Sequence, residues 1–434
     1  YRETAPAAAT REMFAADDGP HGCRFVGVPG TVRGMEMAFE KHGSGKVTWS
    51  DVVMPAVSLA EDGFDLDAWT AGSLNDLVAD SPDYPELRRV FGAPAGWKPG
   101  DRLRQPDLAR SLRAIAGGGA QAFYTGPIAD LVVADMNRGG GLITKADLAA
   151  YRAVERQPIH GTYRGYDIYA PPPPSGGGIV LIEMLNMLET VDLAGLDRWS
   201  PGTLQLMAEV MRRASCDRAL HLGDPDFVTI PDHLTAKSYA AGLAAAIPRD
   251  RPTPSASLAP DIPIAPPEGD STTHFSVVDK DGLAVSNTYT LEYSYGSRVV
   301  VRGGGVLLNN EMLDFNRRPG ITDRTGRIGT EANTIAPGKR MLSSQTPVIV
   351  SRGGRPVLVT GSPGGRTITN TVLCVLVNVL DYHMPLREAI DAPRMHQQWF
   401  PEDVRLEPSP LLEKAVSSLQ AMGYEISSHR QGDA

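Results

Sequence analysis

The spacing of apolar residues predicts helices in the first half of the chain. In residues 105–116 apolar side chains recur on one helical face after Pro106, a residue tolerated at a helix start. Residues 203–222 repeat this spacing, and the turn-forming residues 223–225 end it. Residues 179–188 form a further apolar, helix-like run. We therefore expect the first half to be mainly helical, with few strands.

The second half changes to the alternating pattern typical of strands. Residues 273–279 and 283–291 alternate on either side of a turn, which predicts a hairpin. Further signals predict strands at 298–301, 306–308, 346–350, 357–360 and 425–428, and helices at 367–378, 386–389 and 409–422. The sequence thus predicts an α+β protein with a helix-rich first half and a strand-rich second half.

A proline-rich connector separates the two halves. Residues 251–270 contain six prolines, a density that disfavours regular structure and indicates an irregular, exposed segment. Because the pattern changes from helix to strand across it, we place the main boundary of the chain there. No internal repeat is visible on either side.

Composition narrows the class of protein. Lys and Arg number 42 against 51 Asp and Glu, giving a net charge of −9, and a nucleic-acid-binding protein would need a basic stripe instead. The longest apolar run, 372–380, is interrupted by Asn378 and is far shorter than the roughly 20 residues of a membrane span. Cys23, Cys216 and Cys374 are too few and scattered for a disulfide framework, so we expect buried thiols.

The first candidate for chemistry is the sequence Ser271-Thr272-Thr273-His274, directly after the connector. A hydroxyl becomes a nucleophile when a base lies within hydrogen-bond reach, and cutting the chain before Thr272 would supply its own α-amine as that base. Threonine is also common at strand starts, which leaves a structural role open. Adjacent strand residues face opposite sides, so we expect His274 to be a packing or capping residue.

The second candidate is the glycine-rich turn at residues 360–366, between a predicted strand and a predicted helix. Backbone N–H groups at such a turn suit a phosphate or a developing oxyanion. The spacing matches neither a P-loop nor the G-x-S-x-G turn of hydrolases. Taken alone, the turn also has a purely structural explanation.

The third candidate is an acidic pair, Glu311 and Asp314, three positions apart. No nearby histidine completes a metal-ligand pattern, so a clamp on a cation such as an ammonium group suits the pair better. Ser343 and Ser344 are small hydrogen-bond donors that are equally well explained as turn residues.

Taken together, these segments resemble the gamma-glutamyltransferase family of N-terminal-nucleophile hydrolases. The ordered set covers nearly the whole chain and is far more specific than any single segment. The matching residues are 2–6, 27–32, 141–148, 172–178, 223–227, 272–277, 308–312, 342–344 and 361–365. By comparison with the family, we expect both ends to be truncated, with a segment missing upstream of Arg2 and another after Asp433.

The resemblance implies a four-layer αββα sandwich and self-cleavage between Ser271 and Thr272. The products would be a large piece, 1–271, and a small piece, 272–434. The Thr272 hydroxyl would then attack the γ-amide of glutathione or another γ-glutamyl compound. The resulting acyl-enzyme would pass the γ-glutamyl group to an amine or to water.

The family pattern also assigns roles around the nucleophile. Thr290 would support Thr272 by hydrogen bonding, and the N–H groups of Gly364 and Gly365 would hold the oxyanion. No metal, flavin or nucleotide cofactor is required. Residues 317–340 correspond to a lid over the pocket.

Recognition of the glutamyl head group is implied in the same way. Arg2 is the family's anchor for the α-carboxylate, since its planar guanidinium suits bidentate pairing. Ser343 and Ser344 would donate to the same carboxylate. Glu311 and Asp314 would clamp the α-ammonium.

Two residues depart from the family pattern. Glu292 stands where several members have Asn, and Thr325 where some bacterial members have an aromatic lid residue. Strand alternation from Thr290 would turn Glu292 toward the pocket as a third carboxylate near the ammonium. The alternative is that Glu292 turns away and pairs with Arg298 or Arg302.

Other functions stay open at this point. Relatives of the same fold act as cephalosporin (glutaryl) acylases or as poly-γ-glutamate depolymerases, and an unprocessed, non-catalytic binding protein is a further class. The head-group residues favour γ-glutamyl over glutaryl substrates, because a glutaryl group lacks the ammonium. The resemblance implies a periplasmic or secreted protein whose two pieces stay associated, with a small-molecule donor, an amino acid, peptide or water acceptor, and no nucleic-acid partner.

Overall fold

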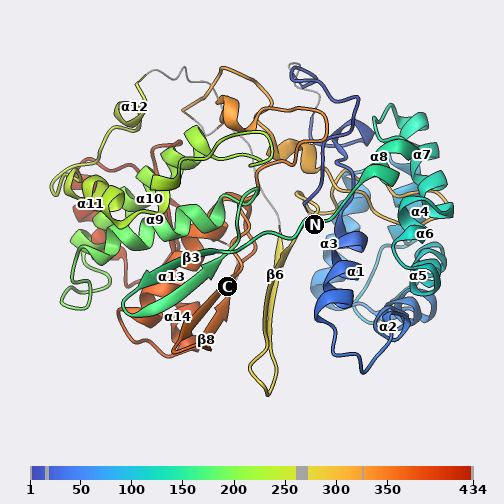
Figure 1. Cartoon of the computed structure of the whole chain (residues 1–434), viewed down its shortest axis with the longest axis horizontal. Helices are drawn as coiled ribbons and strands as arrows, with labels where there is room; N and C mark the ends of the chain where they lie inside the picture. The colour runs from blue at the N-terminus through green and yellow to red at the C-terminus, as the bar shows by residue number, and fades with distance from the viewer. Residues whose placement is uncertain (1, 15–18, 261–271, 325–326, 432–434) are drawn as a thin grey trace. The chain divides into compact units, whose positions relative to one another are not determined.

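The computed structural model of this chain describes residues 2–14, 19–260, 272–324 and 327–431 (Figure 1). These residues divide into two compact units. Unit 1 comprises Tyr1–Glu155, Leu291–Leu313 and Ile335–Met341, and unit 2 comprises Arg156–Thr290, Asp314–Thr334 and Leu342–Ala434. The units do not coincide with the pieces 1–271 and 272–434, which depend on a cut and stay a prediction.

Unit 1 consists mainly of short helices, drawn in blue to teal in Figure 1. Its elements are η1 (Cys23–Phe25), α1 (Thr31–His42), α2 (Trp49–Asp62), β1 (Phe64–Asp65), α3 (Ala68–Ala79), α4 (Pro85–Phe91), β2 (Arg102–Leu103), α5 (Pro106–Gly118), α6 (Gln121–Tyr124), α7 (Pro127–Gly139) and α8 (Lys145–Ala150). The helix expected at 105–116 is confirmed as α5, which packs against α2. A capping box between Thr48 and Asp51 fixes the start of α2.

The prediction of short strands at 298–301 and 306–308 is wrong. These segments meet through one isolated antiparallel bridge, Val300 to Leu307, rather than through a strand pair. Gly303 and Gly305 adopt φ values of 71° and 65°, so a tight turn closes directly behind the bridge. The segments are therefore too short for a ladder.

Unit 2 contains the remaining strands and the longest of the described helices. Its elements are β3 (Ile159–Tyr163), β4 (Tyr166–Ala170), α9 (Gly177–Glu189), α10 (Pro201–His221), η2 (Asp232–Thr235), α11 (Lys237–Ala245), α12 (Ser255–Leu258), β5 (Thr273–Val278), β6 (Ala284–Tyr289), η4 (Glu331–Asn333), β7 (Val348–Arg352), β8 (Arg355–Thr360), η5 (Gly365–Thr367), α13 (Ile368–Leu380), α14 (Leu386–Asp391), β9 (Met395–His396), β10 (Val404–Leu406), α15 (Glu413–Ala421) and β11 (Ile426–Ser428). The remaining helices and strands expected from the sequence are confirmed to within a few residues.

The main sheet of unit 2 combines both halves of the chain. The strand order is β3-β4-β7-β8, and each strand is antiparallel to the strand next to it. The pairing of Asp167–Tyr169 with Ile349–Ser351 joins the halves in the middle of the sheet. Helix α9 contacts β3 and β4 and lies beside α10, α11 and α13 (Figure 1). The expected α+β fold is confirmed.

A nearly solvent-free polar cluster holds the start of the proline-rich connector against α10. We call Gln205, Glu209, Arg213, Thr253 and Tyr424 the Glu209 cluster. The Glu209 carboxylate, 0% exposed, accepts hydrogen bonds from Arg213 Nη1 at 2.6 Å, from the Thr253 N–H at 3.1 Å and from the Tyr424 hydroxyl at 3.0 Å. Gln205 Nε2 donates to the same hydroxyl at 3.2 Å.

A second set of contacts continues along the connector. Ser255 donates its N–H to Glu402 Oε1 at 2.7 Å, and Trp399 Nε1 donates to the Ser255 carbonyl at 2.8 Å. Arg212 Nη1 donates to Ser255 Oγ at 2.5 Å. The connector therefore begins as an anchored segment rather than a loose one.

The three cysteines, Cys23, Cys216 and Cys374, are free and buried, as expected. Burial raises the pKa of the Cys23 thiol to about 11. Among the helices that the structure describes, we find none that is long and apolar enough to cross a membrane.

Candidate functional site

Thr272 lies at the open end of the β5–β6 hairpin. The first strand pair is Thr273 with Tyr289, so Thr272 and Thr290 come opposite each other just beyond it. Thr272 Oγ1 donates to Thr290 Oγ1 at 3.4 Å, the contact that the family pattern implies. Ser271 lies outside the described residues, so the structure does not describe the Ser271–Thr272 bond.

His274 is a packing residue, as the alternation argument predicts. Its Nδ1 is hydrogen-bonded to Thr288 Oγ1 at 2.9 Å and its Nε2 to Ser276 Oγ at 3.0 Å. A side chain at Gly361 would collide with the imidazole. Burial lowers the pKa of His274, which favours the neutral ring.

The glycine-rich turn connects β8 to η5 and α13. Gly364 and Gly365 have φ values of 123° and 54°, a region that L side chains rarely adopt. Thr367 closes the turn by donating its N–H to the Gly364 carbonyl at 3.0 Å and its hydroxyl to the same oxygen at 2.8 Å. The turn thus lies at a helical N-terminus, where N–H groups point toward an approaching anion.

Ser343 and Ser344 are held by neighbours in unit 2. Ser343 Oγ accepts the Gln345 N–H at 3.0 Å, and Ser344 Oγ accepts from Arg218 Nη2 at 2.9 Å. The Ser344 carbonyl accepts from the hydroxyl of Thr369, in α13, at 3.4 Å. The helix that follows the glycine turn therefore also contacts the serine pair.

A small cavity of about 30 Å³ lies beside the serine pair and the end of the glycine-rich turn. Ser344 and Thr369 line it together with Arg366, the residue after Gly365. Arg218 of α10 lines it too, and sequence reasoning did not single this residue out. An arginine on a helix usually indicates a solvated face, and its proximity to Ser344 arises only from the fold.

Asp314 ends η3 (Glu311–Asp314) and belongs to unit 2. Asn333 Nδ2 donates to the Asp314 carbonyl at 2.6 Å, and its Oδ1 accepts the Leu342 N–H at 3.0 Å. One amide therefore fixes the backbone of Asp314 relative to the segment that carries the serine pair.

Unit 1 holds a buried pair, Arg2 and Glu311. Arg2 Nη1 donates to Glu311 Oε2 at 2.5 Å, and their side chains are 9% and 0% exposed. Arg2 Nε donates to the Met341 carbonyl at 3.0 Å, and the Tyr151 hydroxyl donates to the Arg2 carbonyl at 2.9 Å. The structure thus gives Glu311 a cationic partner that the sequence analysis did not anticipate.

Glu292 does not follow the alternation expected from Thr290. Strand β6 ends at Tyr289, and Glu292 has a φ of 77°, so the backbone turns before it. A carboxylate oxygen of Glu292 nevertheless lies within 4.8 Å of one of Glu311. Glu292 therefore lies close to the acidic residue Glu311. The argument from strand alternation is wrong, because the strand ends before Glu292.

The arginines offered as alternative partners of Glu292 have other contacts. Arg298 donates to the Asp80 carbonyl, and the Arg302 guanidinium lies 3.9 Å from Asp135. Thr325, the other departure from the family pattern, lies outside the described residues.

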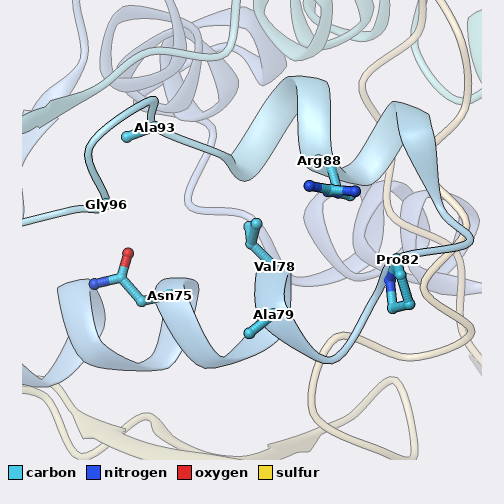
Figure 2. Close-up of a pocket in the computed structure, with 7 residues that line it drawn as sticks. All are labelled: Asn75, Val78, Ala79, Pro82, Arg88, Ala93 and Gly96. Atoms are coloured by element: carbon cyan, nitrogen blue, oxygen red, sulfur yellow. The ribbon is translucent and has the colours of Figure 1, made fainter.

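Unit 1 also has a separate pocket of about 390 Å³ between α3 and α4 (Figure 2). The Asn75 amide closes one side by accepting the Trp97 N–H at 2.7 Å and donating to the Trp97 carbonyl at 3.0 Å. None of the predicted site residues is among those that line it. The lining residues are Asn75, Val78, Ala79, Pro82, Arg88, Ala93 and Gly96.

The predicted residues therefore divide between the two units. In unit 2, the hydroxyl pair Thr272–Thr290, the glycine turn and the serine pair are suited to nucleophilic attack, oxyanion binding and hydrogen bonding to a carboxylate. In unit 1, Arg2, Glu292 and Glu311 provide one cationic and two anionic groups.

Comparison with known proteins agrees with this chemistry. A family model described as Gamma-glutamyltranspeptidase matches residues 1–434. A glutathione hydrolase proenzyme from Escherichia coli (strain K12) is 44% identical over 98% of this chain and 74% of its own length. A glutathione hydrolase proenzyme from Pseudomonas aeruginosa is 41% identical over 98% of this chain and 77% of its own length.

Solved structures show the same fold. A cephalosporin acylase from Bacillus halodurans superimposes with a TM-score of 0.84 at 24% identity, covering 99% of this chain and 77% of that one. A gamma-glutamyltranspeptidase from Helicobacter pylori gives a TM-score of 0.56 at 38% identity, covering 58% of this chain and 75% of that one. The fold of N-terminal-nucleophile hydrolases expected from the motifs is confirmed.

Proposed function

This chain belongs to the gamma-glutamyltranspeptidase family, and we propose that it is a γ-glutamyl transferase/hydrolase acting on glutathione and related γ-glutamyl compounds. The family match confirms the resemblance found in the ordered motifs. The observation that carries the mechanism is the contact between Thr272 Oγ1 and Thr290 Oγ1.

Maturation would begin with hydrolysis of the peptide bond between Ser271 and Thr272. Water adds across this bond, leaving a carboxyl group on Ser271 and a free α-amine on Thr272. The name proenzyme, carried by the relatives, supports such processing. The cut gives the large piece, 1–271, and the small piece, 272–434, which begins with the nucleophile.

Acyl transfer would then use the freed terminus. The Thr272 α-amine takes the hydroxyl proton as Oγ1 attacks the γ-amide carbonyl, directly or through a water. The N–H groups of Gly364 and Gly365 stabilise the oxyanion, and the proton passes to the departing amine. Water or an acceptor amine releases the γ-glutamyl group from the ester in the second half-reaction.

The head-group residues would select the donor. Arg2, Ser343 and Ser344 bind the α-carboxylate, and Glu311 and Asp314 bind the α-ammonium, with Glu292 as an additional acidic group. The Arg2–Glu311 pair supports this proposal, because a carboxylate and an ammonium of one amino acid are complementary to a neighbouring cation and anion.

Denaturing electrophoresis of wild type and Thr272→Ala tests the proposal. Wild type should give bands of about 29 and 17.5 kDa, which divide 46.5 kDa in the ratio of 271 to 163 residues. Thr272→Ala should stay as one band and should not release p-nitroaniline from γ-glutamyl-p-nitroanilide. A cleaved and active Thr272→Ala protein would remove Thr272 from the mechanism. A single wild-type band without activity would favour a non-catalytic binding protein.

A glutaryl acylase is the second candidate function. An acylase ACY 1 proenzyme from Pseudomonas sp. (strain SE83) is 34% identical over 98% of this chain. Glutaryl-p-nitroanilide distinguishes the two functions, because it keeps the reactive amide and the carboxylate and lacks only the α-ammonium. Faster turnover of the glutaryl donor than of the γ-glutamyl donor would favour the acylase.

We also propose that the two pieces stay associated after the cut and that the protein acts in the periplasm or outside the cell. Contacts of Ser255 with Glu402 and Trp399 support the association, because they link residues on opposite sides of the proposed cut.

A further inference from the structure

The motif Pro171-Pro-Pro-Pro-Ser-Gly-Gly-Gly178 takes no part in the proposed reaction, yet it packs against the serine pair. Ser343 donates its N–H to the Pro174 carbonyl at 2.8 Å, and Gly176 donates its N–H to the Ser343 carbonyl at 2.9 Å. Ser175 Oγ donates to the Gln345 carbonyl at 2.5 Å. The motif thus pairs with the serine segment like a short parallel strand.

The glycines are needed because the two segments lie so close. A Cβ atom on Gly177 would stand 2.2 Å from Thr346 Oγ1 and 2.5 Å from the Gln345 carbonyl oxygen. A Cβ on Gly176 would meet Arg218 Nε at 3.1 Å. The motif therefore supports the serine segment on one side and the Arg218 side chain on another.

Arg218 reaches Ser344 from α10. A guanidinium has only N–H donors, so in the 2.9 Å hydrogen bond Ser344 Oγ must be the acceptor. The single O–H of Ser344 must then donate to a different group. An arginine at this position thus fixes the serine hydroxyl as a donor and, through its charge, strengthens that donor toward an anion.

We propose that Arg218, supported by the glycine motif, is a positioning residue that holds the Ser344 hydroxyl for the α-carboxylate of the donor. The inference rests on the proposed γ-glutamyl function and adds a residue to it. Arg218 acts through Ser344, and its effect is confined to donors that carry the carboxylate.

The test compares two donors, γ-glutamyl-p-nitroanilide and 4-aminobutanoyl-p-nitroanilide, which differ only by the α-carboxylate. Arg218→Gln should raise KM for the first donor about tenfold, the scale of one charge-assisted hydrogen bond, with little change in kcat. Its kcat/KM for the second donor should stay within about twofold of wild type. Arg218→Lys should recover part of the loss, because an ammonium still donates.

A double-mutant cycle separates an indirect role from direct contact. If Arg218 acts through Ser344, Ser344→Ala combined with Arg218→Gln should lose no more than Ser344→Ala alone. Additive losses would show that Arg218 acts independently of Ser344 and would overturn the proposal. Arg355→Gln, which removes an exposed arginine at the start of β8, is the matched control for loss of charge.

The remaining outcomes distinguish a failure of the inference from a failure of the function on which it rests. Equal losses on both donors, or a failure of both Arg218 variants to form the cut protein, would assign Arg218 a structural role and overturn the proposal. An inactive wild type would refute the proposed function itself. An active wild type with unaffected Arg218 variants would refute only this inference.

Discussion

The Arg2 guanidinium and the Glu311 carboxylate form a buried ion pair at 2.5 Å, although 309 positions separate them in the chain. The family pattern assigns Arg2 to the carboxylate and Glu311 to the ammonium of the same substrate. Their contact means that each residue already has a partner of opposite charge. A bound α-amino acid group would therefore share an existing pair rather than neutralise two isolated charges.

We predict that Arg2→Gln impairs both stability and activity. Loss of the guanidinium leaves Glu311 buried without its cation, which should lower the free energy of unfolding by roughly 3–5 kcal/mol. The kcat/KM for γ-glutamyl-p-nitroanilide should fall by about 10²–10³ or more. Urea denaturation and steady-state kinetics measure the two effects, and cleavage before Thr272 should survive.

A double variant separates the two effects. Arg2→Gln with Glu311→Gln removes both charges, so stability should largely recover while activity stays low. Unchanged kinetics in Arg2→Gln would place carboxylate recognition elsewhere.

Glu292 combines an unfavourable backbone with an acidic side chain. A φ of 77° is a left-handed conformation in which Asn is enriched and Glu is rare. We predict that Glu292→Asn stabilises the protein by about 1 kcal/mol, or roughly 2–4 °C in melting temperature. It should also shift the ratio of kcat/KM values toward the glutaryl donor, because one anion near the ammonium is lost.

Glu292→Gln is the matched control, since it removes the charge and keeps the side-chain length. It should shift the donor ratio like Glu292→Asn but leave the melting temperature close to wild type. If neither variant changes the donor ratio, Glu292 lies outside the binding site.

His396 should make the protein sensitive to acid. The ring is 1% exposed, accepts from Asn370 Nδ2 at 2.8 Å and contacts Gln398 Oε1 at 2.7 Å. Burial lowers the pKa of His396 to about 4, against about 6.5 in an unfolded chain. Below pH ~6.5 the unfolded chain binds a proton that the folded protein rejects, so stability is full above this pH and falls toward pH ~4.

The expected loss across that range is about 3 kcal/mol. Urea midpoints at pH 7.5, 6 and 5 should show a steeper decline in wild type than in His396→Gln, which has no titrating ring. His160→Gln, at an exposed position, is the matched control for loss of a histidine. An unchanged slope in His396→Gln would assign the acid sensitivity to other groups.

Tyr424 should help to hold the cut pieces together. Its hydroxyl belongs to the small piece and contacts Glu209 and Gln205 of the large piece. We predict that Tyr424→Phe weakens association of the cut pieces about tenfold, equivalent to ~1.4 kcal/mol. Size-exclusion chromatography over a dilution series measures this association.

Tyr239→Phe is the matched control, because the Tyr239 hydroxyl donates to Asp217 within the large piece. It should leave the association unchanged. Neither variant should dissociate in a Thr272→Ala background, where the chain stays continuous. Equal association of the wild-type and Tyr424→Phe pieces would contradict the prediction.

Local patterns predicted the elements well where burial is periodic. Helices α5 and α10 were recognisable because apolar side chains return every three or four residues along one face. Apolar β-branched residues on both sides of a glycine turn predict two strands, but the structure has only the single bridge between Val300 and Leu307. The pairing of β4 with β7 left no signal, since a ladder between distant segments has no local spacing.

The candidate site was predictable as a set of residues but not as a set of contacts. The motif resemblance singled out Thr272, Thr290 and the serine pair, and hydrogen bonds now connect them to specific neighbours. Arg218 and the partner of Glu311 could not be predicted, because each depends on a side chain from a distant segment. Glu292 was placed by strand alternation, and its positive φ could not be read from an acidic residue.

The pairing of β4 with β7 limits how far the proposed cut could change the structure of unit 2. Asp167–Tyr169 precede the proposed cut and Ile349–Ser351 follow it, yet they are neighbours in the middle of one sheet. A break in the backbone before Thr272 would create two new chain ends and would leave the hydrogen bonds between β4 and β7 in place. The mature protein would then consist of two polypeptides, and neither would hold all four strands of the main sheet of unit 2, so each would complete that sheet for the other.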